Sequence, residues 1–195
     1  MNTYNPVYCS IGGAMGREEA GWSGMLYDST PGQRRFTVVA SGIAMVVASV
    51  CAGLSQVPWA SWQWALMLFV AFDLGGGVAA MCLPPAIRKV RPAHEPLKPL
   101  MFAAFHIHPL FLALVFPDQD WTAMFVLYGA GVAGVAAAGL APDAYRAGVS
   151  LAWCACVLPI VQLLGPMPGL AWLAPAYLLK LVGSHAAPLP TGEQS

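Results

Sequence analysis

Six long apolar segments constrain this chain more than any other feature of its sequence. A helix crosses a bilayer core of about 30 Å with about 20 residues, at a rise of 1.5 Å per residue. Five segments approach this length, and a shorter sixth contains two prolines. The segments are residues 36–54, 62–83, 99–116, 121–141, 146–164 and 167–182. The sequence therefore predicts an all-α polytopic membrane protein, a bundle of six transmembrane helices whose sixth member is short enough to be re-entrant instead.

The overall composition excludes a soluble domain. Hydrophobic residues make up 58% of the chain and charged residues only 9%, whereas soluble domains carry about 25% charged residues. Nine Lys and Arg balance nine Asp and Glu, and no basic stripe with interleaved aromatic residues is present, which excludes nucleic acid as a partner. The cysteine count of five is odd, so the cysteines do not form a disulfide framework.

The basic residues indicate how the chain is oriented. With six spans, every Lys and Arg falls on one side of the membrane, and the opposite connections carry only Asp118 and Asp120 as charges. The positive-inside rule then places both termini in the cytoplasm. We expect a partly disordered cytoplasmic extension at 1–35, the bundle at 36–182 and a disordered cytoplasmic tail at 183–195. No apolar segment precedes the first span, so we expect no cleaved signal peptide, and the small chain is typical of a multi-pass protein of the bacterial inner membrane.

Small residues at four-residue spacing predict two helix-packing faces. Spacing of this kind lets helix backbones approach closely in lipid, where no hydrophobic effect drives helices together. One such face lies on the span at 121–141 and the other on the span at 62–83, so we expect these two helices to contact each other. The glycines concerned are Gly75, Gly76, Gly77, Gly129 and Gly134.

Three ionisable side chains lie in the middle of otherwise apolar segments. Asp73 is near the centre of the second span, and His106 and His108 are near the centre of the third. An Asp at the centre of a spanning helix costs about 2.5–3.5 kcal/mol on insertion, so such residues usually face the bundle and have partners. The two spans are antiparallel neighbours, which places the carboxylate and the rings at similar depth. Positions two apart on a helix point about 200° away from each other, so only one ring is expected to face Asp73.

Two backbone features are predicted to soften the helices at this depth. Pro109 removes an N–H, frees the carbonyl of Phe105 and bends its helix beside the histidines. The triple glycine at 75–77 weakens the second span just after Asp73. Irregular backbone inside a membrane is tolerated where it lines a cavity, as it does in transporters. Lys180, close to the end of the sixth segment, is predicted to extend its ammonium to the lipid headgroups.

The leading functional hypothesis is a small proton-coupled carrier in which Asp73 shares a proton with His106 or His108, as relays in pumps do. Its partners would be the lipid bilayer and either further copies of the chain or a membrane subunit. No catalytic nucleophile stands out, since the chain has no G-x-S-x-G motif, which favours a carrier over an enzyme.

Two other hypotheses remain open from the sequence. The same three residues could hold zinc, iron or haem in a membrane enzyme. However, two histidines that are two residues apart on a helix do not point toward the same metal ion, and no fourth ligand stands out. Alternatively, the polar groups only lock helices together in a structural or assembly subunit of a membrane complex. In that case they would form interhelical hydrogen bonds with no further role.

Overall fold

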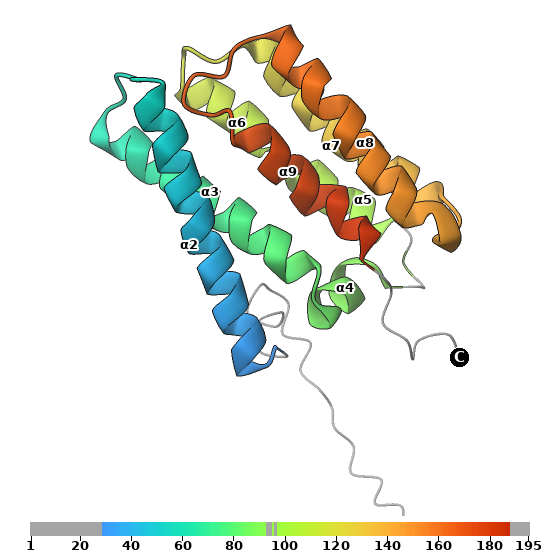
Figure 1. Cartoon of the computed structure of the whole chain (residues 1–195). Coiled ribbons are helices and arrows are strands. Elements are labelled where there is room, and N and C mark those ends of the chain that lie inside the picture. The colour runs from blue at the N-terminus through green and yellow to red at the C-terminus, as the bar shows by residue number, and fades with distance from the viewer. Residues whose placement is uncertain (1–28, 93–94, 96, 188–195) are drawn as a thin grey trace, which may run out of the picture.

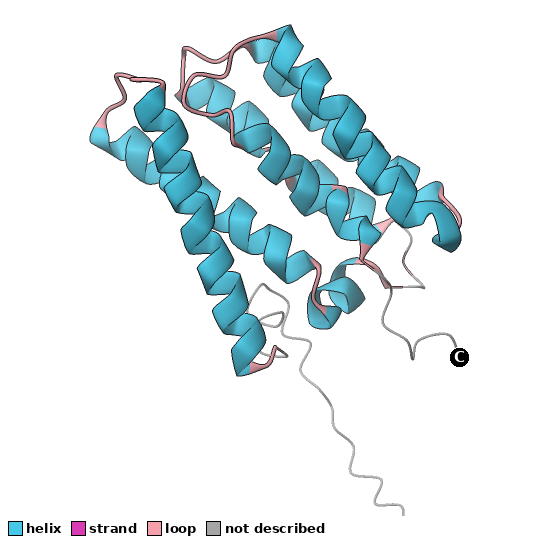
Figure 2. Ribbon diagram, in the orientation of Figure 1, coloured by secondary structure: helices cyan, strands magenta, loops and turns pink. Residues whose placement is uncertain are grey.

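The computed structural model describes residues 29–92, 95 and 97–187. Within this part the chain is helical and contains no strand (Figures 1 and 2). The elements, in chain order, are α2 (Pro31–Leu54), α3 (Ser61–Met81), α4 (Pro84–Val90), α5 (Lys98–Phe105), α6 (His108–Val115), α7 (Trp121–Leu140), α8 (Asp143–Leu164), α9 (Leu173–Leu181) and a 3₁₀ turn η1 (Gly183–Ala186).

Five helical stretches are long and apolar enough to cross a membrane. They are α2, α3, α7, α8 and the pair α5–α6, which together cover Lys98–Val115. Large apolar side chains cover their outer surfaces; Val46 and Leu163, for example, are mostly exposed. Such surfaces are stable in lipid and unstable in water, so the described chain is a helical, multi-pass membrane protein, as its sequence predicts.

Polar caps set the ends of two spans. The Thr30 hydroxyl accepts a hydrogen bond from the N–H of Gln33, the Gln33 side chain returns one to Thr30, and Pro31 occupies the first turn. This capping box starts the helix five residues before the apolar segment predicted from Phe36. At the opposite end of the bundle, the Asp120 carboxylate accepts a hydrogen bond from the N–H of Ala123 and starts α7.

The third span is interrupted where the sequence predicted a bend. α5 ends at Phe105 and α6 begins at His108, with His106 and Ile107 outside both helices. Pro109 lies in the first turn of α6, where its missing N–H is not needed. The prolines do not all act this way, because Pro159 lies inside the continuous helix α8.

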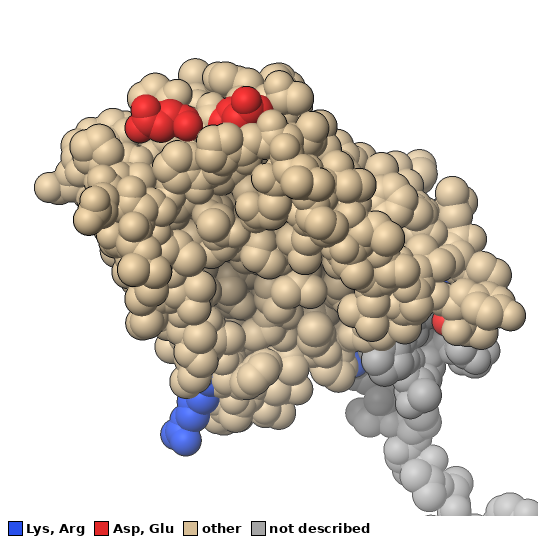
Figure 3. All heavy atoms as spheres, turned by 45° about the horizontal axis from the view of Figure 1, so that its top comes forward, with Lys and Arg blue, Asp and Glu red and all other residues tan. Residues whose placement is uncertain are grey.

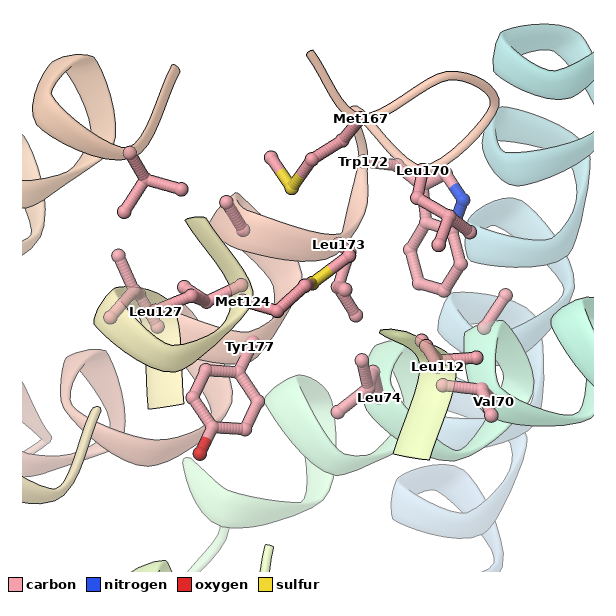
Figure 4. Close-up of a cluster of buried hydrophobic side chains, with 14 of the residues drawn as sticks. Val70, Leu74, Leu112, Met124, Leu127, Met167, Leu170, Trp172, Leu173 and Tyr177 are labelled. Carbon is pink, nitrogen blue, oxygen red and sulfur yellow. The ribbon is translucent and has the colours of Figure 1, made fainter. Parts of the chain in front are cut away.

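The sixth apolar segment is only partly helical. Residues 165–172 form turns before α9 begins. Three of their large side chains, those of Met167, Leu170 and Trp172, are buried. Figure 4 shows them above Leu173 and Tyr177, whose side chains enter the same core. Non-helical backbone at membrane depth is tolerated where protein covers it.

The turn before α9 depends on close packing at Gly169. This residue has a φ of +72°, and a Cβ there would collide with the Trp59 ring. Both the left-handed conformation and the close approach require glycine. The Gln119 amide also donates a hydrogen bond to the Pro168 carbonyl. These contacts fix the turn against the α2–α3 and α6–α7 connections.

The glycine faces pack differently from the prediction that the spans at 62–83 and 121–141 touch. Instead, α3 packs along α2 and against α9, and α7 packs against α8. A Cβ at Gly75 would collide with Ala44, and one at Gly76 with Ser41, both on α2. A Cβ at Gly134 would meet Trp153 of α8 and Val182. The small residues do allow close approach, but Gly75 and Gly76 admit α2 and Gly134 admits Trp153 of α8. These are neighbouring helices in the chain, which a short loop already places alongside.

A Cβ at Gly129 would meet no atom within 4 Å. The expectation that Gly129 packs against another helix is therefore wrong within the described part of the chain.

The two ends of the bundle differ in charge. Figure 1 shows the start of α2, α4, the α7–α8 connection and the end of η1 at one end of the molecule. On the face shown in Figure 3, the larger acidic patches lie at one end and the visible basic side chains at the opposite end. This separation agrees with the charge distribution that the sequence assigns to the connections.

The basic end contains structure that the sequence reading missed. Residues 84–90 of the proline-rich connector form the helix α4. The expectation of a disordered tail from 183 is wrong for 183–187, where η1 buries Ser184 and His185. Arg91 fixes this segment by donating hydrogen bonds to the carbonyls of His185, at 3.1 Å, and Ala187, at 2.9 Å. The predicted extension before residue 29 and the tail after 187 lie outside the described residues.

Candidate functional site

Asp73 lies at the centre of a three-residue polar cluster. One of its carboxylate oxygens, Oδ2, is 2.6 Å from Lys180 Nζ and 3.4 Å from His108 Nε2. Asp73 is in the middle of α3, Lys180 is in the last turn of α9, and His108 is the first residue of α6. We call these three residues the Asp73 triad. It connects helices from the second, third and sixth apolar segments.

The sequence reading missed Lys180 as a member of this site. Its side chain is 0% exposed, so the prediction that it extends to the headgroups is wrong. The chain does not leave the bundle after Lys180, because Val182, Ser184 and His185 follow it as buried residues. Lys180 therefore lies deeper than its place near the end of an apolar segment suggests. The available signal was a carboxylate in a neighbouring span that needed an opposite charge.

Gly77 makes room for the lysine. A Cβ at this position would lie 2.5 Å from Lys180 Cε and 2.7 Å from its Cδ. The lysine stem therefore crosses α3 directly over the glycine backbone, one turn after Asp73. Of the three consecutive glycines, two admit α2 and the third admits Lys180, so the triple glycine has a separate packing reason at each position.

The two histidines have different partners, and they lie on opposite sides of the break between α5 and α6. His108 faces Asp73, whereas His106 is buried and its Nδ1 lies 2.6 Å from the Phe102 carbonyl, to which it donates a hydrogen bond. The two ring centroids are 5.5 Å apart. His106 therefore stabilises the end of α5, and His108 belongs to the Asp73 triad.

Two tyrosines accommodate the break between α5 and α6. The Tyr177 hydroxyl donates a hydrogen bond to the His106 carbonyl at 2.9 Å, and the Tyr128 hydroxyl donates one to the Ala104 carbonyl at 2.9 Å. Backbone carbonyls released by a broken helix must find donors inside a membrane. These tyrosines supply them, so the break that places His108 beside Asp73 is a stable part of the fold.

Two surface hollows meet at the triad. The first, the α2/α3 hollow, has a volume of about 270 Å³ and lies between α2, α3 and the start of α4, with Asp73 and Gly77 in its wall. The second, the α3/α6 hollow, has a volume of about 230 Å³ and contains His108 in its wall. Asp73 is 28% exposed and His108 26% exposed. The contact between them joins the two hollows.

The hollows are displaced along α3. The α3/α6 hollow contacts α3 at residues 66–70, and the α2/α3 hollow extends from 69 past the end of the helix to 86. At 1.5 Å per residue, the first reaches toward the acidic end of the bundle and the second toward the basic end.

His108 Nδ1 is buried and has no hydrogen-bond partner within the described residues, so no bond on that side fixes the ring orientation.

The Asp73 triad brings a carboxylate, an imidazole and an ammonium together. Among the described residues, no group of three or more His, Cys, Asp and Glu side chains is close enough to hold a metal ion. The Asp73 oxygen that faces His108 already accepts a hydrogen bond from the Lys180 ammonium. A carboxylate, an imidazole and an ammonium within hydrogen-bonding range can instead redistribute protons among themselves.

Comparisons with protein-family models, curated proteins and solved structures find no match to this chain. The fold and the site therefore define the class: a helical, multi-pass membrane protein with an ionisable triad in the interior of its bundle.

Proposed function

We propose that this protein is a small proton-coupled membrane carrier and that the Asp73 triad is its proton-binding site. The observation that carries this proposal is that Asp73 and His108 touch each other while each forms part of the wall of a different hollow. A purely structural pair has no need of access from two directions. A proton carrier requires that access, because its site must load from one side and unload to the other.

The proposed orientation places both termini and the basic end in the cytoplasm of a cell membrane. Seven described Lys and Arg residues outside the triad support this through the positive-inside rule, since they lie in the first turns of α2 or α8 or between the end of α3 and the start of α5. They are Arg34, Arg35, Arg88, Lys89, Arg91, Lys98 and Arg146. The sixth crossing would consist of the turns at 165–172 together with α9. The α2/α3 hollow then reaches toward the cytoplasm and the α3/α6 hollow toward the outer half of the membrane.

The proton would move through the triad in steps that this geometry supports. A proton taken up by the neutral His108 gives an imidazolium whose Nε2–H faces the Asp73 carboxylate. Transfer from Nε2 to Oδ2 neutralises Asp73, so Lys180 loses its counter-ion inside the bundle. An uncompensated charge at this depth is costly, which favours rearrangement of α9 against α3 or release of the proton into the α2/α3 hollow.

A structural lock is the second candidate function, and one observation favours it. Lys180 is fully buried and joins α9 to α3 through an ion pair. Such a pair can fix helix register without any proton exchange. The two candidates differ in whether the charge of the triad changes with pH in the folded protein.

Charge movement on a pH jump tests this proposal. Proteoliposomes that contain the full chain are adsorbed on a solid-supported membrane, and the external pH is changed rapidly. We expect a transient current from the wild type and none from Asp73→Asn, because the proton has no carboxylate to reach. Asp118→Asn, the same substitution at an exposed position outside the triad, should give the wild-type current.

The variant Asp73→Asn/Lys180→Gln covers the case in which the single variant does not fold, since it leaves no unpaired charge. It should fold and give no current. Equal currents from the wild type and from either Asp73 variant would refute the carrier proposal and leave the structural lock.

A further inference from the structure

We propose that the α2/α3 hollow binds a small organic cation, an amine with an apolar body, and that binding expels one proton from the Asp73 triad. This inference depends on the proposed function, because it names the substrate class of the same site. It makes the protein a proton–amine exchanger, in which the ligand replaces the Lys180 ammonium as the counter-ion of Asp73.

The chemistry of the wall selects the sign of the ligand charge. Asp73 is the charged residue among those that line the α2/α3 hollow. Its partner Lys180 is 0% exposed and lies behind α3 at Gly77, whereas Asp73 is 28% exposed. A molecule in the hollow therefore meets a carboxylate and not an ammonium. An ammonium group forms a charge-assisted hydrogen bond with such an acceptor, and an anion would be repelled.

The remaining wall favours an apolar body on that cation. Phe69 and Phe72 flank Asp73 on α3, and both rings are substantially exposed. Aromatic faces attract organic cations, more strongly where water is absent. On the α2 side, Ser41 is almost fully buried and the Thr37 hydroxyl donates to the Gln33 carbonyl of its own helix, so this side adds little polar surface. A volume of about 270 Å³ is just below the range of about 300–1,000 Å³ for small-molecule pockets, which suits a small monoamine.

Charge balance requires a proton to leave. Before binding, the triad holds a carboxylate, an ammonium on Lys180 and a neutral His108, with no net charge. An arriving ammonium would leave two cations beside one carboxylate inside the bundle. Loss of one proton from the triad restores neutrality: the ligand ammonium pairs with Asp73, Lys180 remains as a neutral amine over Gly77, and one H⁺ enters the solvent. No bond between heavy atoms forms or breaks.

Calorimetry on the purified full chain in detergent tests this inference with three ligands of similar shape. They are 2-phenylethylamine as the cation, 2-phenylethanol as the neutral molecule and 3-phenylpropionate as the anion. We expect the amine alone to bind, with release of one proton, measured from titrations in buffers of different ionisation enthalpy. Its affinity should rise about tenfold per pH unit between pH 6 and 8.

Variants locate the binding to Asp73. Asp73→Asn should weaken amine binding by at least about tenfold, the loss expected for a hydrogen bond to a charged group, and Asp118→Asn should not change it. If Asp73→Asn does not fold, Asp73→Asn/Lys180→Gln provides the same comparison. The inference is overturned if the alcohol binds as tightly as the amine, if no proton is released, or if the Asp73 variants bind normally.

The outcome is separable from that of the proposed function. A pH-jump current that requires Asp73, together with no amine binding, would keep the proton carrier and reject the amine as its substrate. Absence of the current in the wild type would reject the carrier itself.

Discussion

Two buried cations, Lys180 and Arg91, are stabilised in different ways in the two regions of this protein where they lie. Lys180 is in the interior of the bundle and pairs with the Asp73 carboxylate. Arg91 is at the basic end, is also buried, and donates to the backbone carbonyls of His185 and Ala187. Burial together with the nearby Arg146 lowers the pKa of Arg91 to about 10, so its guanidinium remains charged at neutral pH.

The Lys180 ion pair can be broken by protonation of its partner, whereas the Arg91 contacts cannot. Carbonyl groups do not titrate, so the Arg91 contacts can only hold the last described residues against α4. A carboxylate can accept a proton, so the contact of Lys180 can be broken and remade without unfolding the chain. Depth explains the distinction: a cation at the end of a bundle is near water, whereas a cation in its interior needs a counter-charge.

The largest expected effect breaks the interior pair. Asp73→Leu leaves Lys180 buried without a counter-ion and should destabilise the folded protein by about 3–5 kcal/mol. Because a well-packed apolar pair can replace an ion pair, Asp73→Leu/Lys180→Met should recover most of that loss. Unfolding in mixed detergent micelles measures both. If the double variant is as unstable as the single one, the cost belongs to lost packing and not to the unpaired charge.

At the basic end, removal of the cation should cost less. Arg91→Met deletes two charge-assisted hydrogen bonds and should destabilise the protein by about 3 kcal/mol. The loss should be confined to the end of the chain, so amide exchange is expected to increase at 183–187 and to remain slow in the middle of α3. Arg88→Met, at an exposed position of the preceding helix α4, is the control. Equal acceleration throughout the bundle would contradict the assignment of Arg91 to a local role.

His185 should make the same end sensitive to acid. Burial, followed by the positive charge of Arg91, lowers the pKa of His185 to about 4. Because the unfolded chain takes up this proton near pH 6.5 and the folded chain does so only near pH 4, stability is full above pH 7 and falls as the pH decreases between these values. The expected loss is about 2 kcal/mol from pH 7 to pH 4.5. Unfolding measured across that range should show a shallower slope for His185→Asn; parallel curves would show that His185 is not the titrating group.

The smallest expected effect tests whether the position of Lys180 beside Asp73 matters for proton binding. Gly77→Ala places a methyl group where the Lys180 stem lies and should cost about 1–3 kcal/mol through overpacking. It should also displace the ammonium from Asp73 and reduce the pH-jump current. Gly129→Ala is the matched control, because a Cβ there meets no atom within 4 Å. A full current from Gly77→Ala would mean that the position of Lys180 does not matter for proton binding.

Sequence reasoning placed the helices well because hydropathy and helix length are local properties. Five spanning stretches lie where the apolar segments predicted them, and the break at His106 follows from the Pro109 backbone. The predicted contact between the spans at 62–83 and 121–141 failed for the opposite reason. A spacing of small residues shows that a helix can approach another closely but does not identify that partner. The choice of α2 for Gly75 and Gly76 depends on the short α2–α3 loop.

For the candidate site, too, local sequence properties predict part of the arrangement and packing between distant segments decides the rest. The length of the apolar segments and the charge pattern alone determined that the chain is a helical membrane protein. They also determined that Asp73 needs a partner at its depth, because a charge inside the bundle must be compensated by the protein. Only the tertiary structure decided that the partner is Lys180, that His108 and not His106 faces the carboxylate, and that two hollows meet at this contact. These outcomes depend on the path of the turns at 165–172 and on where α9 comes to lie, which are set by packing between distant segments that no local pattern records.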